Sequence, residues 1–153
     1  MSEDPRPPRA NRKRFGSDEE GSLRELRSAL VAHHKALMEI ARGEWERAHG
    51  RVAAPGELLR LLMEDSELAW LRLLSSKIAR LDALLVDPQQ GDAEELVADL
   101  DRLILDRGPE EAEFQLRYEA ALAGSADVSL FHVQVVHAMR RLRGVTFTLH
   151  DPS

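Results

Sequence analysis

Apolar residues recur at every third or fourth position along most of the chain, and this spacing constrains its fold more than any other feature. Such a period places apolar side chains on one face of an α-helix, which must then pack against another element. Gly50 ends the clearest run, which consists of Leu23, Leu26, Leu30, Leu37 and Ile40. The run predicts a helix from about residue 23 to 49, with Ser22 and Glu25 as a capping box at its start.

Glycine, proline and capping residues divide the rest of the chain into further helical segments. Pro55 suits the first turn of a helix, and Asp65 or Ser66 can cap the next one. Asp92 with Glu95 repeats the capping-box pattern of the first segment. The predicted segments are about 55–64, 66–86, 93–107, 109–124 and 127–144, the last capped by Asp127 and closed by Gly144. We therefore predict an all-α fold, an irregular antiparallel bundle of five to six helices with a disordered basic N-terminal tail. Whether the second and third segments form one continuous helix through Asp65 stays open.

The two ends of the chain lack this periodicity. Residues 1–21 are rich in charge and proline and contain almost nothing apolar, so they are predicted to form a disordered basic tail. Residues 22–144 are predicted to form a single helical-bundle domain, which is long enough to bury a core without disulfides. Val145 to Leu149 is the only strand-like run, and residues 145–153 are predicted to be an extended C-terminal tail on the bundle. The alternative is a strand edge that is offered to a partner.

Composition excludes several classes of function. Cysteine is absent from the 153 residues, which rules out disulfide scaffolds, thiolate catalysis and Cys-ligated metals. The formal net charge is −6, and residues 1–16 carry five basic and two acidic side chains (+3), so the remainder carries −9. An acidic body repels phosphates, which argues against nucleic-acid binding except through the tail. No apolar stretch resembles a membrane span or a secretory signal, so we expect a cytoplasmic protein that does not enter a membrane.

Residues 54–78 are similar to a known group of proteins. The segment Ala54-Pro55-Gly56-Glu57-Leu58-Leu59, followed by Leu68-Ala69-Trp70-Leu71-Arg72 and then Ser75 and Ile78, resembles a family of small, uncharacterised bacterial all-helical proteins. The resemblance implies a helical fold and no particular activity.

His33 is the first candidate for a functional site. It lies on the same predicted helix face as Leu26, Leu30 and Leu37, so its side chain is expected to point into the bundle. An inward histidine can ligate a metal or a haem. The simpler interpretation, which we favour, is a core histidine that is hydrogen-bonded to a neighbouring helix.

Two further patterns suggest a metal. Glu46 and His49 have the Glu-x-x-His spacing of di-iron bundles, which places both on one helix face, although the same residues also suit a solvated final helical turn. Glu44 and His132 are candidates for the inner groups of a ligand-binding bundle together with His33.

The basic cluster Arg12-Lys13-Arg14 is a candidate for contact with nucleic acid or an acidic protein, because a flexible basic arm gains affinity by releasing counterions. The alternative, which we favour, is a tail that only keeps the protein soluble.

The sequence favours a protein-interaction or regulatory accessory module without intrinsic catalysis. Leucine-rich helix faces are abundant, whereas convergent catalytic groups and phosphate-binding glycine motifs are missing. A protein partner or self-association is therefore expected. The alternative is a helical bundle that binds a metal, a haem or a small ligand.

Overall fold

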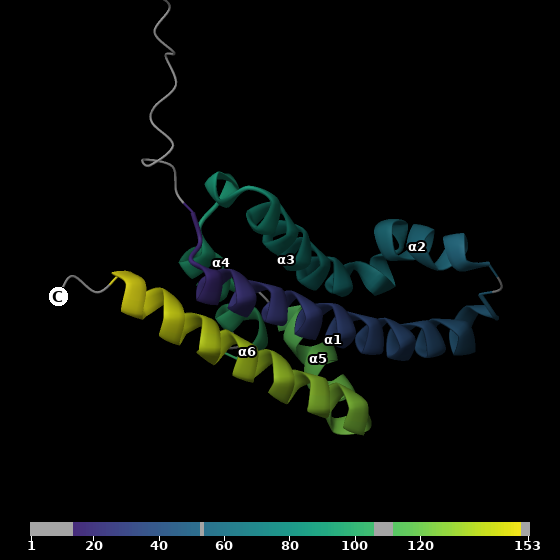
Figure 1. The fold of residues 1–153 in the computed structure, drawn as a ribbon. Helices are drawn as coiled ribbons and strands as arrows, with labels where there is room; N and C mark the ends of the chain where they lie inside the picture. The colour runs from purple at the N-terminus through teal and green to yellow at the C-terminus, as the bar shows by residue number, and fades with distance from the viewer. Residues whose placement is uncertain (1–13, 53, 106–111, 151–153) are drawn as a thin grey trace, which may run out of the picture.

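The computed structural model describes residues 14–52, 54–105 and 112–150, and these residues form an all-α bundle (Figure 1). Within these ranges the backbone forms helices and connecting loops without a β-strand. The elements in chain order are α1 (Ser17–His49), α2 (Pro55–Glu64), η2 (Ser66–Leu68), α3 (Ala69–Val86), η3 (Pro88–Gln90), α4 (Ala93–Ile104), α5 (Ala112–Gly124) and α6 (Ala126–His150). The predicted fold class is confirmed.

The first helix begins earlier than the sequence pattern predicts. It starts at Ser17, so residues 17–21 belong to α1 and not to a tail, and the predicted capping box at Ser22 is not its start. Three acidic residues occupy its first turn. Their negative charge is attracted to the positive end of the helix dipole, which stabilises this start. The predicted end is confirmed, because Gly50 follows the helix with φ 96°, a backbone conformation that favours glycine.

The last helix is longer than predicted. We expected Gly144 to end it and residues 145–149 to be extended, but the backbone is helical through His150. Glycine inside a helix costs only about 1 kcal/mol relative to alanine, so one glycine does not stop a helix by itself. The cap is also different from the prediction. The hydroxyl of Ser125, and not Asp127, accepts a hydrogen bond from the Val128 amide at 3.3 Å.

Asp65 separates α2 from α3, which answers the question that the sequence left open. Its carboxylate accepts hydrogen bonds from the Glu67 amide at 2.7 Å and from Trp45 Nε1 at 3.1 Å. The side chain therefore caps η2 and ties this corner to α1.

The start of α4 agrees with the prediction and its end does not. Asp92 caps the helix, and its carboxylate accepts from the amides of Glu94 and Glu95. The helix ends at Ile104 and not at Gly108, with Leu105 as its C-cap. The predicted first turn of the fifth helix, residues 109–111, lies outside the described residues.

Helix α1 is the centre of the bundle and packs mainly against α6 and α3 (Figure 1). Ion pairs join α1 to both neighbours, Arg141 of α6 to Glu25 at 2.6 Å and Arg27 to Asp82 of α3. Because Glu25 lies early in α1 and Arg141 late in α6, these two helices are antiparallel. Among the described residues, no helix is both long enough and apolar enough to span a membrane.

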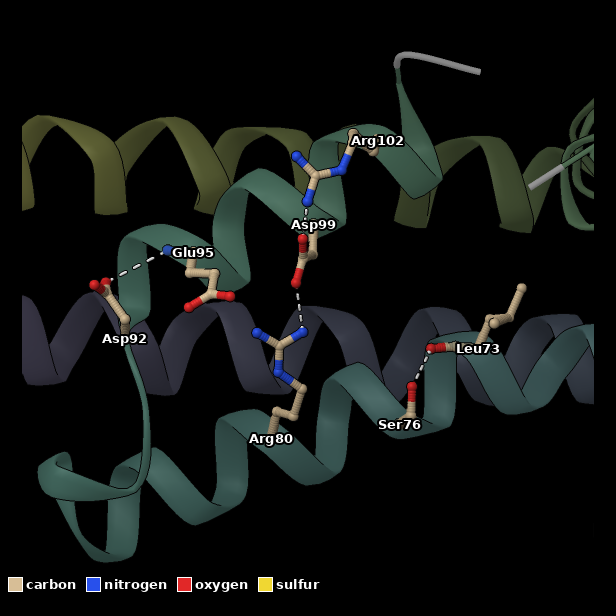
Figure 2. A network of polar contacts seen from close by, with 7 residues as sticks. All are labelled: Leu73, Ser76, Arg80, Asp92, Glu95, Asp99 and Arg102. Atoms are coloured by element: carbon tan, nitrogen blue, oxygen red, sulfur yellow. Dashed lines mark hydrogen bonds and ion pairs between the residues drawn. The ribbon is translucent and has the colours of Figure 1, made fainter. Parts of the chain in front are cut away.

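A second ion-pair network joins α3 to α4 (Figure 2). Arg80 of α3 donates to Asp99 of α4 at 2.6 Å, and Arg102 contacts the other oxygen of the same carboxylate. The two guanidinium groups, Arg80 first, hold the pKa of Asp99 below its ordinary value. The network is partly exposed, so each of its ion pairs contributes little to stability.

Candidate functional site

Three polar side chains meet in the core where α1, α5 and α6 converge. His33 Nε2 lies 2.6 Å from the Tyr118 hydroxyl oxygen, and the same oxygen lies 2.6 Å from His132 Nδ1. His33 is 0% exposed and Tyr118 is 3% exposed. We call this group the His33–Tyr118–His132 junction. Because each residue comes from a different helix, it fixes the relative positions of all three.

The hydrogens in this junction are constrained. The hydroxyl of Tyr118 has one proton, so it donates to one histidine and accepts from the other. His33 Nδ1 is buried and has no hydrogen-bond partner in the structure. A buried N–H without an acceptor is rare and costly, so the favourable tautomer of His33 carries its proton on Nε2. In that arrangement His33 donates to Tyr118, and Tyr118 donates to His132.

Burial keeps two members of the junction, His33 and Tyr118, uncharged. Removal from water, together with smaller contributions from the nearby His132 and His34, lowers the pKa of His33 from 6.5 to about 4. Burial also raises the pKa of the Tyr118 hydroxyl. Both His33 and Tyr118 are therefore uncharged at neutral pH.

The neighbouring His34 has a separate partner. Its Nε2 lies 2.7 Å from the hydroxyl oxygen of Ser75, and that hydroxyl donates to the Leu71 carbonyl at 3.2 Å. Burial lowers the pKa of His34 as well. This contact joins α1 to α3 in the way that the junction joins α1 to α5 and α6.

The structure brings two of the predicted metal-site residues together and places the others elsewhere. His33 points inward as predicted, and its ring centroid is 6.3 Å from that of His132. Glu44 is exposed and lines a shallow groove between α1 and the end of α5, beside Ile40 and Ala121. It is therefore not an inner group of the bundle.

Glu46 and His49 both contact nearby residues of the chain. Glu46 Oε1 accepts from Arg42 Nε at 3.0 Å and from the Val52 amide at 3.1 Å. The His49 ring stacks on Trp45 with 4.5 Å between centroids, and its Nδ1 lies 3.1 Å from the Trp45 carbonyl oxygen. In the part of the chain that the structure describes, no three His, Asp or Glu side chains are grouped to hold a metal ion.

The predicted nucleic-acid contact is largely outside the structure. Arg12 and Lys13 lie outside the described residues, and Arg14 is exposed just before α1 begins. This contact stays a prediction.

Sequence reasoning missed the apolar face of α2. Leu59 and Met63 are 58% and 64% exposed, whereas Leu62 between them is 7% exposed. The two exposed side chains are four residues apart, so they lie about 40° apart around the helix and form one stripe. The sequence does contain a signal for an exposed apolar face. Five of the ten residues in α2 are Leu or Met, and they cover more than one side of the helix.

Charged side chains border this stripe. Arg60 directly follows Leu59, and Glu64 directly follows Met63. The two charged residues are therefore also four residues apart and lie on one flank of the stripe. Both are exposed, and neither has an ion-pair partner among the described residues. We call these four residues the α2 face. Its apolar and charged groups are therefore all available for contact.

No family model, curated protein or solved structure matches the chain. The resemblance of residues 54–78 to small bacterial helical proteins stays a prediction.

Proposed function

We propose that this protein is a helical interaction module that acts in the cytoplasm by presenting the α2 face to another protein, without catalysis of its own. The observation that carries the proposal is the exposure of Leu59 and Met63 on a helix that packs against α3 and η2 on its other side. Full burial of an exposed Leu or Met side chain is worth about 1.5–3 kcal/mol, and Leu59 and Met63 each have more than half of that surface left to bury.

The position of α2 also supports this role. The helix lies at one end of the molecule, at the turn between the C-terminal end of α1 and the start of α3 (Figure 1). A partner can reach it there without separating the helices that form the core. Exposed apolar side chains that are adjacent and bordered by charge are typical of protein contact sites.

Site-specific crosslinking tests the proposal. A photo-activated amino acid at position 63 is expected to form a discrete protein adduct in cells, while the same amino acid at the exposed Arg140 of α6 forms none. The partner is then purified, and Leu59→Glu is expected to weaken its binding. Equal crosslinking at both positions, or binding unaffected by Leu59→Glu, would overturn the proposal.

One observation supports a second candidate function, the binding of a small ligand or ion. A cavity of about 90 Å³ lies between α4, α5 and α6, and the polar side chains Gln115, Tyr118, Glu119 and His132 line it. This is room for about three water molecules, so a haem does not fit in it. Native mass spectrometry tests this function, since a bound ion adds mass that His132→Ala should remove. No excess over the sequence mass in the wild type, or the same excess in the wild type and in His132→Ala, would overturn it.

A further inference from the structure

We infer that the α2 face binds the α2 face of a second copy of this chain, with the two helices antiparallel about a two-fold axis. This inference rests on the proposed function and names the partner. It starts from the order of apolar and charged residues along α2, which is complementary to itself.

The apolar residues match in this arrangement. A two-fold axis that passes midway between Leu59 and Met63, at the level of Leu61, places Leu59 of one copy opposite Met63 of the other, and the reverse contact forms by symmetry. Each copy then covers the two side chains that are 58% and 64% exposed in the single chain.

The charges match in the same arrangement. In an antiparallel pair with this symmetry, the same flank of each helix meets its own counterpart. Arg60 of one copy then lies near Glu64 of the other, about 3 Å away along the helix axis, and the contact again forms twice. A parallel pair would place this charged flank against the opposite flank of the partner. The charges therefore select the antiparallel orientation.

The inference also predicts a weak dimer. Stable interfaces bury about 1,600 Å² in total, and one face of a ten-residue helix is smaller than that. Association should depend on protein concentration. It should also weaken with salt, because exposed ion pairs are screened at high ionic strength.

Charge reversal tests the pairing directly. Arg60→Glu leaves two acidic residues on the charged flank, and Glu64→Arg leaves two basic residues, so each variant should repel its own copy. Each is expected to raise the dissociation constant about tenfold or more. An equimolar mixture of the two variants should restore association, because each acidic residue then meets an arginine. Sedimentation velocity over a concentration series measures all three samples.

Matched controls separate this effect from misfolding. Both positions are exposed, so circular dichroism spectra and thermal midpoints should equal those of the wild type when both are measured on protein dilute enough to be monomeric. The exposed pair Arg140→Glu and Glu113→Arg repeats the same charge changes on α6 and α5 and should leave association unchanged.

Three outcomes would overturn the inference. A wild-type chain that is monomeric at every concentration excludes a second copy, and the crosslinking at position 63 then decides separately whether another protein binds there. A wild-type dimer that neither charge reversal weakens forms through another surface. Two weakened variants that do not recover on mixing exclude the antiparallel pairing.

Discussion

The His33–Tyr118–His132 junction and the α2 face are opposites, because the junction buries polar side chains and the α2 face exposes apolar ones. In the junction, polar atoms are buried and two short hydrogen bonds join three helices. On the α2 face, apolar side chains are exposed and two opposite charges have no ion-pair partner among the described residues. The hydrogen bonds of the junction favour one arrangement of α1, α5 and α6 over others. The exposed residues of the α2 face contribute little to that packing, which is why we propose that they contact another molecule.

Acidification should give the largest effect, and it should act through the junction. Because the pKa of His33 falls from 6.5 to about 4 on folding, the unfolded chain binds this proton first as the pH falls. The contribution of His33 to the free energy of unfolding is therefore complete above pH 6.5 and is lost towards pH 4, by about 3 kcal/mol. Urea denaturation at a series of pH values measures it.

The control for acidification is His33→Gln, which has no group that titrates in this range. Its stability should fall less steeply between pH 6.5 and 4 than that of the wild type. Parallel pH profiles for the two proteins would show that His33 is not the source.

Removing the hydroxyl of the junction should give an intermediate effect. Tyr118→Phe keeps the ring but leaves His33 Nε2 and His132 Nδ1 without their shared partner, which should lower the free energy of unfolding by about 1–3 kcal/mol. Urea denaturation at pH 7 measures the loss. Ser75→Ala removes a hydroxyl at a partly exposed contact and should cost less. An equal or larger loss in Ser75→Ala would contradict the comparison.

Changing the α2 face should give the smallest effect on stability. Met63→Glu alters a side chain that is 64% exposed, so the free energy of unfolding should stay within about 0.5 kcal/mol of the wild type. The buried neighbour is the matched control, because Leu62→Ala should cost about 2–5 kcal/mol. Thermal or urea unfolding of dilute protein measures both. A large loss in Met63→Glu would mean that this face supports the fold itself.

The sequence alone predicts the features that depend on local chemistry. The spacing of Leu26, Leu30 and Leu37 was enough to point His33 inward, and Asp92 was recognised as a cap. The sequence predicts helix ends wrongly where local preferences are weak. Helix α1 begins at Ser17 and not near residue 23, and α6 continues through Gly144. Both errors concern costs of about 1 kcal/mol or less, which packing and helix-end charge outweigh.

The sequence does not predict which residues contact each other in the candidate sites, and the reason is different. Tyr118 lies 85 residues from His33, and nothing in the local pattern indicates that their helices meet at this height. The exposure of Leu59 likewise depends on which side of α2 turns towards α3. Contacts of this kind are set by the assembled bundle, and a single sequence contains no direct record of them.

The pairing of α1 with α6 has a consequence for synthesis on the ribosome. Helix α1 packs mainly against α6 and less against α3, so part of its apolar face stays uncovered on a nascent chain until α6 has emerged. The α1 residues that pack against α6 are covered only by a stretch that is made about a hundred residues later. Long-range closure of this kind slows folding. Helix α1 thus completes its packing only after α6 has been translated.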